Sequence, residues 1–384
     1  MEKRKRVREL GLTIGVFPPG KCNAITDVAG VRVGHKTLVW GDPAHPSRRG
    51  IARTGVTVIL PNEEIYNQRL FAGSSIINGA GEMTGLIQIE EWGLLETPIA
   101  LTSSMNVGIV SDGIAEYMVQ EYRAVREKGH VILPVVGECN DGTMNDPTRR
   151  FVKQHHVLEA LRDAREGPVE EGAVGGGTGM VCCQFKGGIG TSSRVVDRGY
   201  TVGVLVMSNF GERKDLLIKG IPVGKFLAQS EPETGRSEGS IIIVIATDAP
   251  LLPHQLDRLA KRSLIGLGRV GSYAENGSGE ITIAFSTANR FPQVDPLKIS
   301  RKKEAQFRSI QMLKNEALNP LFEATVECVE EAILNSLFRS RTLEGRKGMI
   351  PGLPLEQVVD ILRRYNPLSG KLENYQSSSF SSST

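Results

Sequence analysis

The sequence has no uninterrupted apolar run of the roughly 18–20 residues that a membrane-spanning helix needs. Its basic start, Met1–Arg8, is followed by no apolar segment of the kind that a secretory signal carries. The two absences argue against a membrane-embedded or exported chain. We therefore expect a cytoplasmic protein with no membrane partner.

Cysteine and net charge are also scarce. Five cysteines in 384 residues, an odd number in a long chain, do not form the disulfide framework of a small secreted domain. The adjacent pair Cys182–Cys183 lies in an apolar run, where we expect it to belong to the core. The formal net charge is only +3, which gives no reason to expect nucleic acid as a partner.

Recognisable metal-binding spacings are missing as well. The sequence contains neither a His-Glu-x-x-His motif nor paired Cys-x-x-Cys motifs. His155 and His156 are adjacent in a segment of helical pattern, where neighbouring side chains point apart. We expect a reaction that needs neither a metal nor another cofactor.

The chain is rich in short apolar segments bounded by glycine, proline, asparagine or aspartate. Hydrophobic residues make up 40% of the chain, enough for a large buried core. The pattern predicts a mixed α/β protein. The expected strands are Val28–Val33, Gly55–Leu60, Ile99–Leu101, Val131–Val136, Gly179–Phe185, Thr201–Met207, Ser240–Thr247 and Glu280–Thr287. The expected helices are Gly81–Glu91, Asp112–Lys128, Pro253–Leu264, Pro320–Phe338 and Leu355–Arg364.

The junction Gly239–Ser240 is the most informative point. A polar, turn-forming stretch runs directly into the apolar strand Ser240–Thr247, and a serine stands at the boundary. A self-cleaving precursor would place its nucleophile there, because the hydroxyl can attack the preceding glycine carbonyl and leave Ser240 as a new N-terminus. From the dipeptide alone, an ordinary turn serine before a strand explains the same residues.

Two further segments carry candidate chemistry. Ser278 and Glu280 are two residues apart before an apolar strand, so an extended backbone projects both side chains to one face. Asn209 follows the strand Thr201–Met207, where a side-chain amide could stabilise an oxyanion. The alternatives are a glycine-rich hairpin turn with a solvated glutamate, and a capping asparagine.

The glycine-rich stretch Ala173–Gly179 invites a phosphate-loop interpretation, but it lacks the Gly-Lys-Ser/Thr of such a loop. We expect its backbone to line a cleft, with Thr178 nearby. Ser103, Ser104 and Asn106 follow the strand Ile99–Leu101 and could line the same pocket, and we assign them no catalytic role.

Taken in order, nine segments resemble the L-aminopeptidase/D-esterase family, which includes the β-peptidyl aminopeptidases. The resemblance extends over roughly residues 5 to 290. The segments are Leu12–Phe17, Asn23–Asp27, Val31–His35, Thr54–Pro61, Val136–Gly142, Ala173–Met180, Tyr200–Gly211, Gly239–Ser240 and Arg258–Asn289.

This resemblance implies an architecture. Family members are four-layer αββα sandwiches of the N-terminal-nucleophile type, cut into two chains that stay associated. Here the α chain would be residues 1–239 and the β chain residues 240–384, within one catalytic domain over 1–375. The serine-rich tail 376–384 is expected to be disordered. The family also suggests a homo-oligomer, a tetramer of αβ units.

The resemblance also implies roles for particular residues. Ser240, Ser278 and Glu280 correspond to a Ser-Ser-Glu triad, and Asn209 to the oxyanion donor. Glu138 corresponds to the carboxylate that binds the substrate's free amine. Asn140 stands where some members carry an aromatic residue, and we expect an altered substrate preference.

The activity implied is that of a self-processing serine aminopeptidase, which removes α- or β-aminoacyl groups from small peptides, amides or esters. Two alternatives remain open. Ornithine acetyltransferases have a similar fold and also cleave themselves, but they use a threonine nucleophile. A binding protein on the same scaffold would keep the fold without cutting itself.

Overall fold

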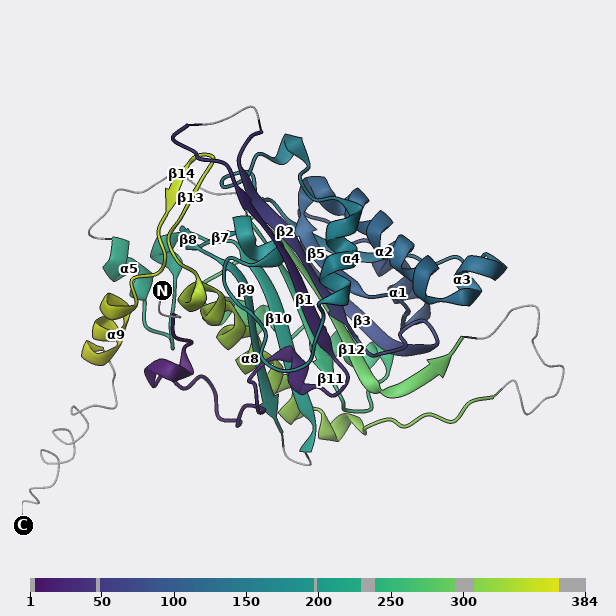
Figure 1. Ribbon diagram of the computed structural model, residues 1–384. Helices are drawn as coiled ribbons and strands as arrows, with labels where there is room; N and C mark the ends of the chain where they lie inside the picture. Colours follow the sequence, from purple (N-terminus) through teal and green to yellow (C-terminus); the bar gives the residue numbers. More distant parts are fainter. Residues whose placement is uncertain (1–3, 46–48, 197–198, 229–238, 294–306, 366–384) are drawn as a thin grey trace, which may run out of the picture.

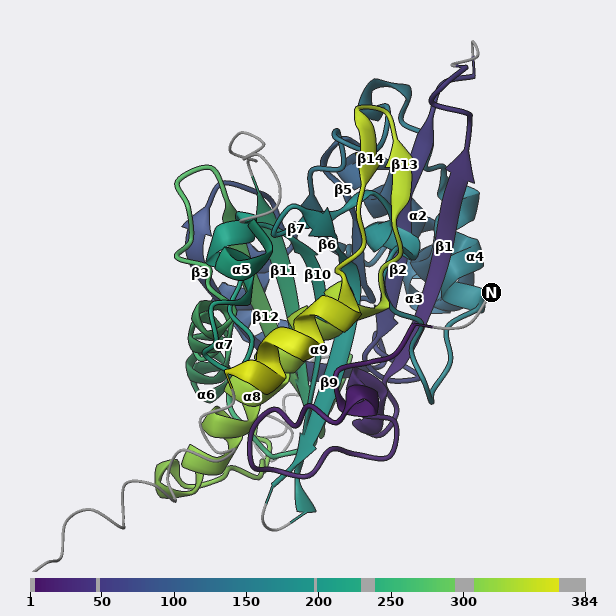
Figure 2. The ribbon, with the colours of Figure 1, turned by 90° about the vertical axis from the view of Figure 1, so that its left-hand side faces the viewer.

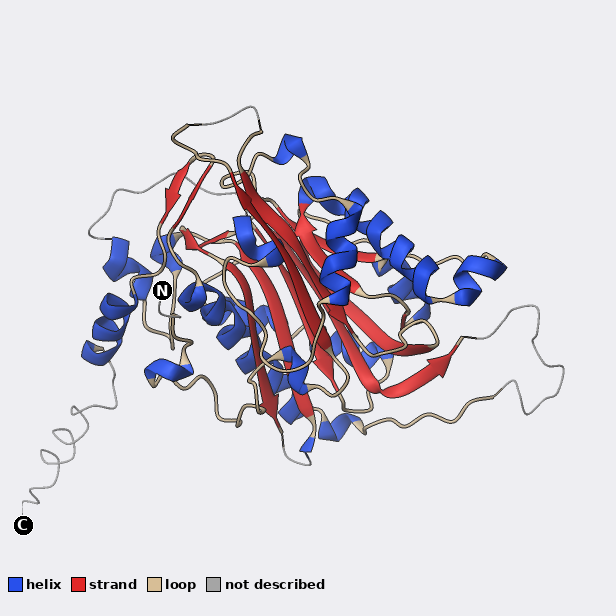
Figure 3. Ribbon diagram, in the orientation of Figure 1, coloured by secondary structure: helices blue, strands red, loops and turns tan. Residues whose placement is uncertain are grey.

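The computed structural model describes residues 4–45, 49–196, 199–228, 239–293 and 307–365. Two β-sheets face each other, and helices cover the outer face of each (Figures 1 and 3). The order of layers is clear in Figure 2, where α6 and α7 lie at one side, the two sheets in the middle and α2 and α4 at the other side. The predicted αββα sandwich is confirmed. The expected tail 376–384 lies outside the described residues.

The smaller sheet has four strands in the order β1-β2-β5-β6. All pairs are antiparallel except β5 with β6, which run parallel. Its outer face packs against α2 and α4 through buried apolar side chains. The elements are β1 (Arg32–Trp40), β2 (Ala52–Leu60), β5 (Ile99–Ser103), β6 (Val135–Cys139), α2 (Val107–Glu121), α3 (Arg123–Lys128) and α4 (Gln154–Arg162).

The larger sheet has six strands in the order β4-β3-β12-β11-β10-β9. Only β11 and β12 are parallel neighbours. Its outer face is covered by α6, α7 and α8. The elements are β3 (Gln68–Gly79), β4 (Leu94–Leu95), β9 (Gly188–Val195), β10 (Thr201–Asn209), β11 (Ser240–Thr247), β12 (Gly279–Pro292), α6 (Pro253–Ala260), α7 (Ser263–Arg269) and α8 (Asn319–Arg339).

The remaining elements lie at the edges of these layers. Among the described residues no helix combines the length and the apolar character that a bilayer span requires. All five cysteines are free thiols. The elements are α1 (Leu86–Trp92), β7 (Val181–Cys182), β8 (Phe185–Lys186), α5 (Val223–Ala228), β13 (Leu343–Gly345), β14 (Gly348–Ile350) and α9 (Leu355–Arg364).

Strand β11 shows why the two sheets pack as they do. A strand buried on both faces reads as a continuous apolar run, and β11 consists of isoleucine, valine and alanine between Ser240 and Thr247. Ile242 and Val244 belong to the core between the sheets, whereas Ile241 and Ile243 belong to the core under the helices. The alternation therefore directs Ser240 toward the smaller sheet.

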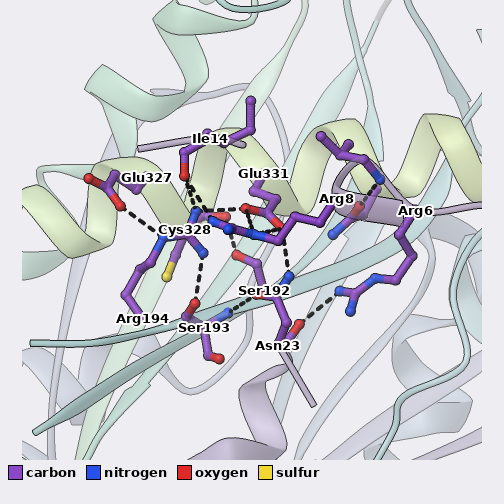
Figure 4. A network of polar contacts seen from close by, with 12 residues as sticks. Arg6, Arg8, Ile14, Asn23, Ser192, Ser193, Arg194, Glu327, Cys328 and Glu331 are labelled. Atoms are coloured by element: carbon purple, nitrogen blue, oxygen red, sulfur yellow. Dashed lines mark hydrogen bonds and ion pairs between the residues drawn. The ribbon is translucent and has the colours of Figure 1, made fainter. Parts of the chain in front are cut away.

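A buried ionic network ties the N-terminal segment to β9 and α8 (Figure 4). Arg194 on β9 is fully buried and pairs with Glu327 at 2.8 Å and with Glu331 at 2.6 Å, both on α8. Arg8 pairs with the same Glu331 at 2.9 Å, and Asn23 donates to it at 2.6 Å. Because the charges compensate one another, burial of the cation is tolerated.

The local predictions fail at four places. The expected strand Val28–Val33 is mostly a turn, because β1 begins only at Arg32. The expected strand Val131–Val136 overlaps β6 only at its last two residues. The expected strand Gly179–Phe185 is wrong: it is a short 3-10 turn followed by the β7–β8 hairpin, in which Cys183 and Gln184 have left-handed φ angles of 49° and 58°. The expected helix start at Asp112 is also wrong, because α2 begins at Val107 directly after β5 and the turn Ser104–Asn106.

Candidate active site

Three strand ends meet at one end of the larger sheet. Asn209, the last residue of β10, is the antiparallel partner of Ser240, the first residue of β11. Gly279, the first residue of β12, is the parallel partner of Ser240. Ser240 therefore lies between Asn209 on one neighbouring strand and the Ser278–Glu280 segment on the other.

The bond between Gly239 and Ser240 is held by main-chain contacts. The backbone N–H of Gly279 donates to the carbonyl oxygen of Gly239 at 3.3 Å. A Cβ at position 239 would lie 2.8 Å from Cα of Phe210 and 2.9 Å from the carbonyl oxygen of Asn209. Glycine is needed here because a side chain would not fit. Its backbone conformation is not the reason, since its φ lies outside the left-handed region. The carbonyl that Ser240 would attack is already polarised by a donor.

Ser240 itself is 4% exposed and lies against β6 of the other sheet. The Cys139 thiol, on β6, is fully buried; burial raises its pKa, and a hydrogen bond with Ser240 opposes that rise. The nucleophile candidate is consequently enclosed by both sheets, with little bulk water to compete for charge that develops there.

Ser278 and Glu280 form a hydrogen-bonded pair, as their i, i+2 spacing predicts. Ser278 Oγ donates to Glu280 Oε1, and both side chains are buried. Burial raises the pKa of Glu280 to about 7, the hydrogen bond from Ser278 opposes the rise, and the Glu275 carboxylate adds to it. Within the described part of the chain, Glu280 Oε2 is buried without a hydrogen-bond partner. This oxygen remains able to accept one more proton donor.

Asn78 fixes the loop that carries this pair, and the sequence analysis did not identify it. Its side-chain nitrogen donates to the carbonyl oxygens of Glu275 at 2.7 Å, of Asn276 at 3.1 Å and of Ser278 at 2.6 Å. Asn78 is also the antiparallel partner of Glu280 in the β3–β12 pair. The Asn-Gly at the end of β3 was the available signal, although it suggests only a turn.

The Asn209 amide is oriented by two neighbours. The backbone N–H of Val181 donates to its Oδ1 at 2.8 Å, and its Nδ2 donates to the carbonyl oxygen of Asn140 at 3.1 Å. An amide nitrogen has two hydrogens, so one remains for an oxyanion. Asn140 acts through its main chain, since its exposed side chain accepts from the N–H of Gly142 at 2.8 Å.

Glu138 reaches the same region from β6. The backbone N–H of Glu82 donates to its Oε1 at 3.0 Å, and Ser104 Oγ donates to its Oε2. Glu138 is 7% exposed; burial raises the pKa of its carboxyl, and the Ser104 hydrogen bond opposes that rise. The structure therefore brings all the predicted site residues to one end of the sheets, and adds Ser104 and Asn78.

The glycine-rich stretch does not present its N–H groups to an anion. The N–H of Gly175 donates to Thr37, that of Gly176 to Thr57 and that of Gly177 to the carbonyl of Val174. The segment is buried, with Gly176 close to Leu101 of β5. The segment is therefore not a phosphate loop, as its missing Gly-Lys-Ser/Thr predicted.

The described residues contain no cluster of three or more His, Cys, Asp or Glu side chains that could hold a metal ion. His35, on β1, shares a hydrogen bond of 2.9 Å with Thr57 on β2. Burial lowers the pKa of His35 to about 4, so this imidazole is neutral at pH 7 and joins two strands.

Comparison with known proteins identifies the family of the chain. A family model described as peptidase family S58 matches residues 23–350. The β-peptidyl aminopeptidase BapA of Sphingosinicella microcystinivorans is 43% identical over 382 residues, which cover 95% of this chain and 93% of that protein. The chain belongs to peptidase family S58.

Two solved structures extend the similarity to three dimensions. A β-aminopeptidase of a Burkholderia species superposes with a TM-score of 0.85 at 44% identity, covering 94% of this chain and 99% of the other. The L-aminopeptidase D-Ala-esterase/amidase of Ochrobactrum anthropi, described as a variant of the Ntn hydrolase fold, gives 0.86 at 39% identity, covering 95% and 99%. The resemblance inferred from the nine segments is confirmed, and the fold is that of an Ntn-type hydrolase.

Proposed function

We propose that this protein is a serine aminopeptidase that activates itself by cutting the bond between Gly239 and Ser240. One observation carries the proposal: Ser240 lies between Asn209 and the hydrogen-bonded Ser278–Glu280 pair, and the Gly239 carbonyl beside it already accepts a hydrogen bond from Gly279. Nucleophile, amide donor and carboxylate therefore converge at one scissile bond.

Self-cleavage follows from these contacts. Ser240 Oγ attacks the carbonyl carbon of Gly239, and the N–H of Gly279 stabilises the oxyanion that forms. The C–N bond breaks, the nitrogen of Ser240 takes up the proton of the hydroxyl, and an ester joins Gly239 to Ser240. Water hydrolyses this ester, leaving a carboxylate at Gly239 and a free amine at Ser240.

Turnover uses the same hydroxyl on a separate substrate. The substrate's ammonium binds Glu138, which places its carbonyl carbon near Ser240 Oγ. The free amine of Ser240 takes the proton, and the charge of that amine is balanced by Glu280 through Ser278. Asn209 Nδ2 donates to the oxyanion, the leaving group departs with a proton, and water then hydrolyses the acyl-enzyme.

The substrate class follows from the relatives and from the site. The similar proteins are named for β-peptidyl, β-amino and L-amino acyl substrates and for amide and ester hydrolysis. We propose small peptides, amides and esters with a free α- or β-amine as substrates. Asn140 supplies no aromatic surface, so we expect a preference different from that of members that carry an aromatic residue there.

The assembly that goes with this function has three parts. Residues 1–239 and 240–384 form two chains that stay associated, the αβ units form a homo-oligomer, a tetramer, and the protein acts in the cytoplasm on small molecules. Support for the first part comes from the larger sheet, because β11 pairs with β10 and β12 pairs with β3, so two strands that follow the cleavage point lie between strands that precede it. Size-exclusion chromatography with light scattering tests the oligomer.

The test of the function is hydrolysis of aminoacyl p-nitroanilides, with an α- and a β-amino acid, by wild type and by Ser240→Ala. We expect the wild type to release p-nitroaniline and the variant to release none. Acetyl transfer from an acetylated amino acid to a second amino acid, without net hydrolysis, would instead support the acetyltransferase alternative. Absence of both reactions would favour the binding protein.

A further inference from the structure

We propose that Ser104 is a positioning residue that holds the Glu138 carboxylate in the orientation needed to bind the substrate's primary ammonium group. The inference rests on the proposed aminopeptidase function and deepens it. It assigns a role to a serine that sequence analysis could place near the pocket only in general terms.

The register of the smaller sheet explains how Ser104 reaches Glu138. In the parallel β5–β6 pair, Thr102 is the partner of Glu138, and Ser103 is the partner of Cys139. Ser104 comes one residue after the end of β5 and begins a short 3-10 turn. Its hydroxyl donates across to Glu138 Oε2 on the neighbouring strand.

The second carboxylate oxygen is held from another part of the chain. The segment Glu82–Thr84 runs antiparallel beside β6: the N–H of Glu138 donates to the carbonyl of Glu82 at 3.2 Å, and that of Thr84 donates to the carbonyl of Val136 at 3.0 Å. This pairing directs the N–H of Glu82 to Glu138 Oε1 at 3.0 Å. Each oxygen of Glu138 thus accepts one fixed donor.

The two oxygens of Glu138 still have free acceptor positions for an ammonium group. A carboxylate oxygen can accept two hydrogen bonds, so one acceptor position remains on each oxygen of Glu138. An ammonium group carries three donors and is attracted by the ionised carboxylate. Ser104, Glu82 and Gly81 are exposed, so this buried carboxylate lies directly beneath solvent-accessible residues.

The carboxylate is also at a useful distance from the reacting bond. A Cβ on Gly81 would lie 3.2 Å from Glu138 Oε1 and 3.7 Å from Cα of Gly279, which places the two within about 7 Å of each other. Gly279 is the strand partner of Ser240. Since neighbouring strands lie about 4.8 Å apart, Glu138 Oε1 is within about 12 Å of Cα of Ser240, a span that a substrate one or two residues long can bridge.

The Ser104 hydroxyl both orients the Glu138 carboxylate and favours its ionised form. Burial disfavours the ionised form of Glu138, as does the nearby Glu82 carboxylate, while the Ser104 hydroxyl donates to the ionised form and favours it. Removing the hydroxyl frees the side chain to rotate and makes ionisation harder. Both effects weaken ammonium binding and leave the nucleophile untouched.

Self-cleavage provides an internal control, because the Gly239–Ser240 bond is cut without any substrate ammonium. We would compare wild type, Ser104→Ala and Ser104→Thr, which restores a hydroxyl. For each, the rate of appearance of the two fragments is followed by mass spectrometry, and KM and kcat are measured on an aminoacyl p-nitroanilide. An amino alcohol and its N-acetyl derivative serve as competitive inhibitors.

We expect Ser104→Ala to raise KM and the inhibition constant of the free amino alcohol about tenfold, the loss typical of one hydrogen bond to a charged group. We expect kcat within about twofold of wild type, an unchanged self-cleavage rate, and recovery of KM in Ser104→Thr. Three results would each overturn the assignment. They are an unchanged KM in Ser104→Ala, a parallel fall of kcat and of the self-cleavage rate, and a Ser104→Thr variant that behaves like Ser104→Ala. A wild type without aminopeptidase activity would contradict the proposed function, and binding of the amino alcohol measured by calorimetry would then still test Ser104.

Discussion

Asn209 and Ser240 are direct partners in the antiparallel β10–β11 pair, at the point where β10 ends and β11 begins. The pairing places a side-chain amide beside the candidate nucleophile on a rigid sheet rather than on a loop. The amide is oriented by Val181 from the β7–β8 hairpin and by Asn140, which directly follows β6 of the other sheet. An oxyanion donor fixed in this way needs no rearrangement during the reaction.

Asn209→Asp tests this donor. Aspartate is almost isosteric and keeps an acceptor for the N–H of Val181, but an ionised carboxylate has no hydrogen to donate to an oxyanion. We expect kcat on an aminoacyl p-nitroanilide to fall by about 10²–10³, with a much smaller change of KM. Steady-state kinetics on the fully cleaved variant gives both parameters.

The control for Asn209→Asp is Asn140→Ala, because the Asn140 contact with Asn209 is made by the main chain. We expect kcat in that variant to stay within a few-fold of wild type. A kcat in Asn209→Asp that is close to wild type would remove Asn209 from the oxyanion site.

The pKa of Glu280 predicts a pH dependence. A carboxyl group loses its proton as pH rises, so with a pKa of about 7 Glu280 becomes ionised above neutrality. The proposed mechanism needs the ionised form to accept from Ser278, and kcat should therefore rise with pH through about 7. Glu280→Gln should lower kcat at pH 8 by at least tenfold and leave only the rise that belongs to the free amine of Ser240, a group that ordinarily titrates at about 8.

Glu275→Gln is the matched control for Glu280. The Glu275 carboxylate raises the pKa of Glu280, so removing its charge should move the rise in kcat to lower pH and leave the plateau unchanged. A rise in kcat that stays at the same pH in Glu275→Gln, or a kcat at pH 8 in Glu280→Gln that is close to wild type, would take Glu280 out of the mechanism.

The network around Arg194 predicts how the two fragments stay together. Arg8 and Arg194 precede the proposed cleavage point, whereas Glu327 and Glu331 follow it, so all three ion pairs would join the α chain to the β chain. Arg194→Met leaves buried carboxylates without their main cation, which costs about 3–5 kcal/mol in comparable cases. We expect the cleaved variant to separate into fragments at a lower urea concentration than wild type, as measured by size-exclusion chromatography.

Two comparisons isolate this effect. Arg123→Met removes a solvent-exposed ion pair with Glu127 and should leave the urea midpoint nearly unchanged. In the Ser240→Ala background the chain stays intact. Arg194→Met should then lower the urea midpoint, and the midpoint should not depend on protein concentration. Fragments of Arg194→Met that stay associated as firmly as those of wild type would show that the sheet alone holds the chains.

The strands that could be predicted are those whose residues are apolar on both faces. Ser240–Thr247 was predicted with the bounds that β11 has, because isoleucine and valine fill it. Strand β9 was missed because, apart from Ile189, its buried positions are glycine, serine, threonine and arginine. Its hydroxyls are satisfied by distant groups, such as the carbonyl of Cys328 for Ser192 and that of Val204 for Thr191.

The same limit applies to the site. Ser278 and Glu280 could be paired from the sequence because an extended chain brings i and i+2 together. Ser104 and Asn78 could not be assigned, because their partners come from strands that are adjacent only after folding. The glycine-rich segment 175–179 could be excluded as a phosphate loop from its sequence, but the acceptors of its N–H groups could not be predicted, because Thr37 and Thr57 lie on β1 and β2.

The central claim is that Ser240 cuts its own chain, and the intact mass of the freshly purified, denatured protein tests it most directly. For wild type we predict two fragments, the smaller one beginning Ser-Ile-Ile-Ile by N-terminal sequencing. For Ser240→Ala we predict a single species of full length. One stable full-length species from wild type, or fragments that still form in Ser240→Ala, would contradict the account.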